Sequence, residues 1–340
     1  MRQKAPLQKI HVTALALGRE LGYGVPLCFP KTKDDLFMRP FMTLPSVIAL
    51  MALPVAALLS PAAAQKLTPW EQAKAIITDA GDDQWRLVDP ENMLIMDLPN
   101  GPITIELRPD LAPKHVAQIK TLTRQGFYNG VVFHRVIEGF MAQGGDPTGT
   151  GQGDSELPDI QPEFVRTKDE IVNAHYIGRD YRSPAIGFIG PVPVAAEPDA
   201  LKSFLEQNDV GLWGVHCPGV MSMARTEDPG SANSQFFLMF ADARSSLDQK
   251  YTVWGRIVDG YEKSRRISRG EPPVRPTPIV RMRVGADVPA SEQQKVEVFR
   301  TDSSVFTDYL KRIGRMSDDG FIGDICAITV PSRINGDVEL

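Results

Sequence analysis

The stretch that decides the fold runs from Phe133 to Asp146 and reads FHRVIEGFMAQGGD. Two short β-rich segments, 131–136 and 140–143, lie in and around it. Similar short segments recur along the chain, at 187–194, 219–223, 235–240, 252–258 and 279–284. Many short strands, few helices, and 28 glycines with 28 prolines in 340 residues indicate a mainly β protein built as a closed barrel.

The residues before this stretch add a hairpin and a helix. Two apolar segments, 93–98 and 103–107, flank the Asn100-Gly101 pair, which is a strong hairpin signal. Apolar residues then recur at helical spacing over 112–125, with a proline in the first turn and a glycine directly after the last residue. We therefore expect an antiparallel sheet that begins as a hairpin and is followed by an amphipathic helix.

A second stretch, from Met221 to Phe237, contains MSMAR and NSQFF. Together with FHRVIEGFMAQGGD it resembles the signature of the cyclophilin family, and the segments 103–107 and 247–257 agree with the same pattern. The resemblance covers about 92–262 and is interrupted by an irregular segment, 155–215, which we interpret as a long loop insertion over the barrel. It implies a closed eight-stranded antiparallel β-barrel capped by two helices.

The resemblance also implies peptidyl-prolyl cis/trans isomerase activity on proline-containing polypeptides, without a cofactor, a metal or a covalent intermediate. An X-Pro bond rotates slowly because resonance gives its C–N bond partial double-bond character. In the twisted state the prolyl nitrogen regains a lone pair, which a fixed cationic donor stabilises more than it stabilises the planar bond. Arg135 matches the family's catalytic arginine, and Gln143 matches the glutamine that helps to place it.

The remaining site residues follow from the same match. The residues that match the apolar pocket for the proline ring are Phe140, Met141, Phe237 and Leu247, and those that match the groove for the substrate chain are Ala224, Arg225, Gln235 and Tyr251. Taken singly, an arginine in this setting is more often a surface ion-pair partner, and these apolar residues are more often plain barrel core. All of them are in register with one signature, which favours the site.

Two positions depart from the family pattern. Ser246 stands where many members carry a tryptophan, so an indole donor and its apolar area are missing and we expect weak cyclosporin binding. Tyr251 stands where many members carry a histidine. The lost tryptophan favours the alternative function, a cyclophilin-fold protein-binding or chaperone module with little turnover, whereas the retained Arg135, Phe140, Gln143 and Phe237 favour the enzyme.

Residues 38–64 have the three parts of a secretory signal peptide: a positive start, an apolar run over 47–59, and small residues at Ala62 and Ala64. We expect cleavage near Ala64 and an exported, periplasmic mature protein without a stable membrane span. An uncleaved N-terminal anchor is the alternative. Because residues 1–37 precede this signal, Met38 is the expected start of translation.

The expected organisation is a leader over 1–64, an N-terminal helical extension over 65–91, the barrel domain over 92–290, and a C-terminal extension over 291–340. Helical patterns occur at 68–80 and 304–315, the second one capped by Asp302-Ser303. Two of the three cysteines, Cys217 and Cys326, survive cleavage, and the sequence leaves open whether they pair or stay as buried thiols.

The net charge and the spacing of the histidines disfavour other classes of function. A formal net charge of -5 with a pI near 5.6 disfavours nucleic acid as a partner. The histidines at 115, 134, 175 and 216 lack metal-ligand spacing, and no Ser-His-Asp arrangement stands out, so we expect them to be structural or surface residues.

Overall fold

The computed structural model describes residues 67–167, 174–197 and 209–340. The leader expected over 1–64, its cleavage site and Cys28 lie outside the described residues. No helix in the described ranges combines the length and the apolar character that a membrane crossing requires.

The principal element is a curled antiparallel sheet of eight strands. In spatial order these are β14 (Arg281–Val284), β2 (Met93–Leu98), β3 (Gly101–Leu107), β13 (Val253–Asp259), β11 (Val220–Met223), β12 (Phe236–Met239), β5 (Met141–Gly144) and β4 (Arg135–Ile137). The expected hairpin is present as β2 and β3, which turn at Asn100-Gly101. The mainly β fold predicted from the sequence is confirmed.

The sheet is not fully closed, which corrects the expectation of a closed barrel. Its edge strands β14 and β4 do not pair as a ladder; the segments before them meet in an isolated bridge between Val132 and Pro278. Two backbone hydrogen bonds flank the bridge, from Phe133 N to Thr277 O (3.0 Å) and from Ile279 N to Val131 O (2.8 Å). The seam cannot extend into a ladder because the incoming segment, 271–278, holds four prolines, which have no N–H to donate.

Side chains alternate between the two faces of this sheet, and each face belongs to a different core. Along β12, Phe236 and Leu238 belong to a core inside the curl, whereas Phe237 and Met239 belong to a second core outside it. Helix α2 (Pro113–Arg124) adds its buried Val116, Ile119 and Leu122 to the inner core, as its apolar spacing predicts. The outer core continues into the insertion and both extensions.

The insertion is more ordered than the loop expected for 155–215. It forms its own antiparallel sheet, in the order β6 (Val165–Thr167), β10 (Asp209–Gly214), β9 (Val192–Ala196), β8 (Ala185–Ile189) and β7 (His175–Gly178). The expected strand over 187–194 is in fact a hairpin, because Gly190 adopts a left-handed conformation (φ 55°) and turns β8 back into β9.

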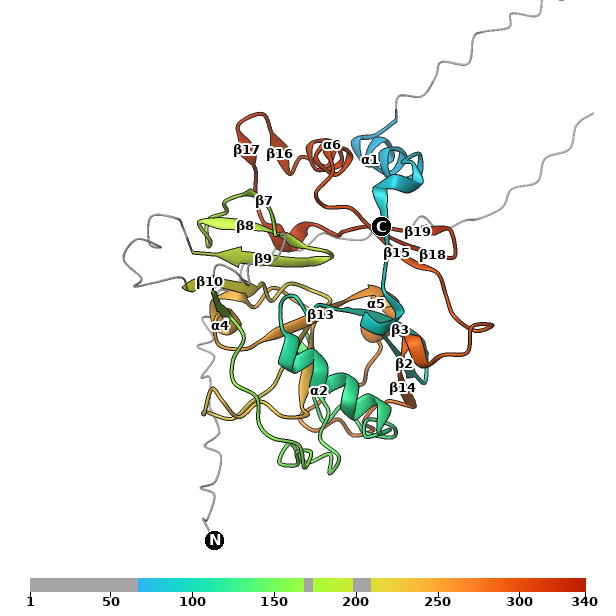
Figure 1. Ribbon diagram of the computed structural model, residues 1–340, viewed down its shortest axis with the longest axis vertical. Helices are drawn as coiled ribbons and strands as arrows, with labels where there is room; N and C mark the ends of the chain where they lie inside the picture. Colours follow the sequence, from blue (N-terminus) through green and yellow to red (C-terminus); the bar gives the residue numbers. More distant parts are fainter. Residues whose placement is uncertain (1–66, 168–173, 198–208) are drawn as a thin grey trace, which may run out of the picture. The chain divides into compact units, whose positions relative to one another are not determined.

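The N-terminal and C-terminal extensions meet in a third sheet. Its order is β1 (Trp85–Leu87), β15 (Val296–Phe299), β18 (Ser332–Ile334) and β19 (Asp337–Glu339). Helix α1 (Pro69–Thr78) packs beside helix α6 (Ser304–Arg312), as Figure 1 shows. Both helices are capped: Thr68 and Glu71 form a capping box, and the Ser303 hydroxyl accepts from Phe306 N, within the cap predicted at Asp302-Ser303.

The remaining elements are short. They comprise the helices α4 (Arg244–Leu247) and α5 (Tyr261–Ser264), the 3₁₀ turns η1 (Asp82–Gln84), η2 (Pro90–Asn92), η4 (Gly285–Asp287) and η5 (Ile325–Ala327), and the hairpin β16 (Met316–Ser317) with β17 (Gly320–Phe321). The question left open for the cysteines is resolved, because Cys217 and Cys326 form a disulfide across 109 residues (Cα to Cα, 4.9 Å). This bond joins the C-terminal extension to the segment that leads into β11.

Candidate functional site

A row of side chains crosses four neighbouring strands. In the register of the sheet Arg135 on β4 is opposite Gln143 on β5, Gln143 is opposite Phe237 on β12, and Phe237 is opposite Ser222 on β11. Residues directly opposite one another in an antiparallel sheet project from the same face. The fold therefore brings the predicted catalytic pair beside a predicted pocket residue on the outer face of the curl.

Arg135 lies at the exposed end of this row. Its side chain is 42% exposed, and its Nε donates to Glu271 Oε2 at 2.8 Å. Within the described residues neither Nη atom has a protein acceptor, so the end of the guanidinium is open to a ligand. Arg135 is thus a surface ion-pair partner, the more common role of a single arginine in this setting. Its guanidinium still presents free N–H donors.

Gln143 is oriented by a chain of amides. Gln235 Nε2 donates to Gly153 O at 2.9 Å, so Gln235 Oε1 is turned back and accepts from Gln143 Nε2 at 3.0 Å. This assignment leaves Gln143 Oε1 as an acceptor beside Arg135. The predicted groove residue Gln235 therefore acts on the site through Gln143.

The predicted pocket residues come together in the outer core. Met141, Phe237, Leu247 and Ala224 are all less than 10% exposed, and the half-buried Phe140 and Tyr251 pack against the same cluster. The ring of Phe237 meets the ring of Tyr251 edge to face, with 5.6 Å between centroids. The interpretation of these residues as plain interior of the barrel is disfavoured, since Met141 and Phe237 lie on the opposite face of the sheet.

Arg225 and Ala224 lie beside two other predicted site residues, Tyr251 and Gln235. The Arg225 guanidinium lies 4.7 Å from the Tyr251 ring centroid, and its Nε donates to Lys250 O at 2.8 Å. The Ala224 N–H donates to Gln235 O at 2.8 Å, so the Ala224 carbonyl is the backbone group that remains for a substrate chain.

The loop after Gln143 is held by Asp146. Burial by itself favours the neutral carboxyl, but hydrogen bonds from Thr148 and from the N–H groups of Gly151 and Gly153 outweigh it and hold the pKa of Asp146 below its usual range. Burial lowers the pKa of the adjacent His134, which keeps its imidazole neutral at pH 7. The glycine-rich segment 149–153 is accordingly a loop wrapped around a carboxylate.

Sequence reasoning missed two parts of this region. One is Glu271, which reaches Arg135 from 136 residues away and carries no local signal. The other is a Ser-His-Asp grouping that does not stand out in the sequence: the His216 ring lies 2.8 Å from Asp248 Oδ1 through Nδ1 and 3.0 Å from Ser222 Oγ through Nε2. Ser222 and His216 are fully buried, so no substrate reaches the hydroxyl and the group is not a hydrolytic triad.

Ser246, the position of the missing tryptophan, lies exposed on α4. Its Oγ donates to Ala243 O at 3.0 Å within the same turn of chain. The hydroxyl is therefore turned to the backbone, and this position adds no apolar area to the pocket.

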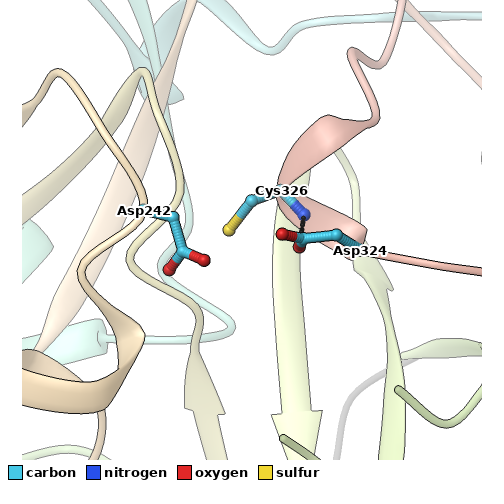
Figure 2. A group of neighbouring side chains, drawn as sticks. All are labelled: Asp242, Asp324 and Cys326. Carbon is cyan, nitrogen blue, oxygen red and sulfur yellow. Dashed lines mark hydrogen bonds between the residues drawn. The ribbon is translucent and has the colours of Figure 1, made fainter. Parts of the chain in front are cut away.

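Figure 2 shows a group of possible metal ligands formed by Asp242, Asp324 and Cys326. The Cys326 sulfur is bonded to Cys217, so it offers no thiolate. Arg244 donates to both carboxylates, at 2.9 Å to Asp242 and 2.6 Å to Asp324. The group is a buried arginine with its counter-ions and not a metal centre.

Two hollows, of about 230 and 440 Å³, lie beside Arg86 and Arg108 and include none of the predicted site residues. Their charged groups are already paired with one another, Arg86 with Glu106 and Arg108 with Asp110. We assign them no role in the chemistry.

The chain is similar in sequence and structure to known proteins of one family. The family model described as cyclophilin type peptidyl-prolyl cis-trans isomerase/CLD matches residues 93–284. A probable peptidyl-prolyl cis-trans isomerase of Brucella suis is 38% identical over 193 residues, covering 54% of this chain and 74% of that protein. A putative peptidyl-prolyl cis-trans isomerase of Staphylococcus saprophyticus is 34% identical over 176 residues, 51% of this chain and 78% of its own.

Among solved structures, the crystal structure of cyclophilin AquaCyp293 from Hirschia baltica superposes with a TM-score of 0.65 at 36% sequence identity. It covers 77% of this chain and 96% of that chain. Since the family model spans 93–284, the likeness to this structure reaches beyond the family region of the chain.

Proposed function

Because the chain belongs to the cyclophilin-type peptidyl-prolyl cis-trans isomerases, we propose that it accelerates X-Pro rotation in exported polypeptides by using Arg135 to stabilise the twisted bond. The family binds proline-containing peptides. The observation that carries the proposal is the row from Arg135 through Gln143 to Phe237, which sets a cationic donor beside an apolar pocket.

The chemistry assigns one task to each end of that row. Phe237 and Met141 hold the proline ring on one side of the bond, while the chain on the other side rotates. As the bond twists, the prolyl nitrogen regains its lone pair, and the free Nη–H groups of Arg135 donate to it. A guanidinium suits this task because it keeps its charge and its geometry throughout the reaction.

Gln143 and Glu271 position the arginine. Glu271 takes the Nε donor at 2.8 Å, which directs the Nη atoms outward. Gln143 Oε1, left as an acceptor by the amide chain, can take an N–H of the arginine or of the substrate. No proton is transferred in this scheme, so none of the three side chains has to change its protonation state.

The test is an NMR exchange assay on a short X-Pro peptide. We expect Arg135→Ala to lower kcat/KM by about 10²–10³, the usual effect of removing one preorganised donor, while the fold survives. Arg281→Ala is the matched control, because Arg281 is also an exposed arginine in an ion pair, with Asp97. A folded Arg135→Ala protein with the full rate would refute the mechanism, and an inactive wild-type protein that binds the peptide would favour the binding-module alternative.

Cyclosporin binding should be weak, since Ser246 supplies neither an indole donor nor apolar area. Ser246→Trp should tighten the binding about tenfold, by burial of an aromatic ring and one new donor. Inhibition of the unaltered protein at nanomolar cyclosporin would contradict this part of the proposal.

Export rests on the signal-like segment 38–64 and makes physical sense of the activity. Uncatalysed X-Pro isomerisation takes tens to hundreds of seconds, long enough to limit the folding of chains that arrive outside the cytoplasm. N-terminal sequencing of the protein from fractionated cells should give a mature chain that begins near Gln65 in the periplasmic fraction. An intact Met1 in the cytosolic fraction would refute both the cleavage and the location.

A further inference from the structure

A buried histidine lies directly behind the proline pocket. His216 is fully buried, and its ring is stacked on that of Phe237 with 5.9 Å between centroids and 19° between planes. Tyr251 meets the same Phe237 ring edge-on, at 83°. The Phe237 ring thus packs against both an imidazole and a phenol.

The imidazole itself cannot turn without losing hydrogen bonds. A carboxylate only accepts, so the 2.8 Å contact to Asp248 Oδ1 fixes the proton on Nδ1. Ser222 Oγ lies 3.0 Å from Nε2 and itself donates to Thr252 O at 3.0 Å. Both ring nitrogens are engaged, and the plane that stacks on Phe237 is defined by them.

Asp248 is fixed in its turn by elements outside the curled sheet. Besides the His216 ring, it accepts from His216 N at 3.0 Å and from Trp213 Nε1 at 3.2 Å. Trp213 belongs to β10 of the insertion, and Cys217, next to His216, is bonded to Cys326 of the C-terminal extension. The insertion and the extension therefore converge on the residue that backs the pocket.

We propose that His216 and Asp248 are a positioning pair, which holds the Phe237 ring in the orientation that receives proline. Neither residue touches the substrate. The inference rests on the proposed function, because the proline pocket is the one assigned there. It gives the insertion and the C-terminal extension a role, since they fix the wall of the pocket through Trp213 and the disulfide.

Two variants test the His216 ring and its acceptor Asp248 separately. His216→Asn keeps an amide N–H near the place of Nδ1 and so retains the bond to Asp248, but removes the ring that stacks on Phe237. Asp248→Asn keeps the ring and loses the charged acceptor that fixes it. We expect KM to rise about three- to tenfold in the first and two- to fivefold in the second, with kcat within twofold, since a pocket used equally in ground and transition states sets KM.

The control is Ser332→Ala, which removes another buried hydrogen bond, from Ser332 Oγ to Val258 O, away from the pocket. It should lower the melting temperature and leave KM unchanged. If His216→Asn does not fold, Trp213→Phe takes its place, because it removes only one of the three donors to Asp248. An unchanged KM in the folded variants would overturn the proposal.

The outcome is separable from that of the proposed function. NMR titration with a proline-containing peptide gives a Kd without turnover, and the positioning pair requires that Kd rise in His216→Asn even if the wild-type protein has no measurable rate. An unchanged Kd overturns the pair whatever the rate is. Arg135→Ala, in contrast, should lower kcat with a smaller effect on Kd.

Discussion

The two sides of the proposed proline-binding region are built differently. The arginine side, formed by Arg135, Gln143 and Glu271, is open to solvent: the ion pair that holds Arg135 is 42% exposed at one partner and 52% at the other. The pocket wall, formed by Phe237, His216, Asp248 and the residues packed on them, is closed, with Phe237 5% exposed and His216 fully buried.

This difference matches the task that we propose for each side. The group that follows a rotating bond needs some freedom, and an exposed ion pair contributes only about 0.2–1 kcal/mol, which lets it adjust. A wall that fixes one end of the bond needs rigidity instead. The burial of His216, with a hydrogen-bond partner at each ring nitrogen, provides that rigidity. The insertion and extensions contact the wall side through the outer core, so the additions to the family domain reinforce the part that must not move.

The largest effect on the pocket wall is expected from removal of the disulfide between Cys217, next to His216, and Cys326. The Cys217→Ala, Cys326→Ser double variant should lose about 2–5 kcal/mol of unfolding free energy, because the disulfide constrains a long loop in the unfolded chain. Urea denaturation measures this. At temperatures where the variant is folded, we expect a raised KM and a kcat close to that of the wild type; a lower kcat with an unchanged KM would mean that the link serves the arginine side instead.

A smaller loss of stability is expected from acid, at the ion pairs of Arg244 in α4, the helix that ends just before Asp248. Burial favours the neutral form of Asp242, but the hydrogen bonds from Arg244 outweigh it and hold the pKa of Asp242 below its usual range. A carboxyl whose pKa is lower in the folded state contributes stability above its unfolded pKa and loses it as the pH falls through the folded value. We expect Asp242→Asn to cost about 1–2 kcal/mol at pH 7 and less at pH 3. Equal losses at both pH values would contradict the assignment.

The smallest effect is expected on the arginine side. Glu271→Gln keeps the shape of the partner and removes its charge, so kcat should change two- to fivefold at most, in keeping with an exposed pair. The difference from the wild type should shrink in 1 M salt, because screening weakens the pair that the variant lacks. A change of a hundredfold would show that Arg135 is fixed as firmly as the wall, and the comparison between the two sides would fail.

The sequence predicts well those contacts that form within one short stretch of the chain. FHRVIEGFMAQGGD folds into β4 and β5, which pair over a span of nine residues, so the proximity of Arg135 and Gln143 is encoded within one stretch. The second stretch supplies Phe237 in the neighbouring strand. The catalytic and binding roles of these residues remain predictions until variants are assayed.

What the sequence does not predict depends on contacts between distant segments. Glu271 meets Arg135 across 136 residues, and Cys217 meets Cys326 across 109. The insertion sheet pairs β6 with β10, which no periodicity near either strand indicates. The open seam could have been foreseen from the prolines of 271–278, because a strand that lacks N–H donors cannot complete a ladder.

The third sheet sets an order on biosynthesis. Strand β1, Trp85–Leu87, has its partner in β15, Val296–Phe299, and the ring of Trp85 packs edge-on against Phe299. A ribosome has to translate some two hundred further codons before that partner exists, so the early strand waits with an unpaired edge while the rest of the chain is made. Such distant pairing slows folding and exposes an edge to other chains. We therefore expect this protein to fold slowly, because its third sheet can form only after β15 has been synthesised.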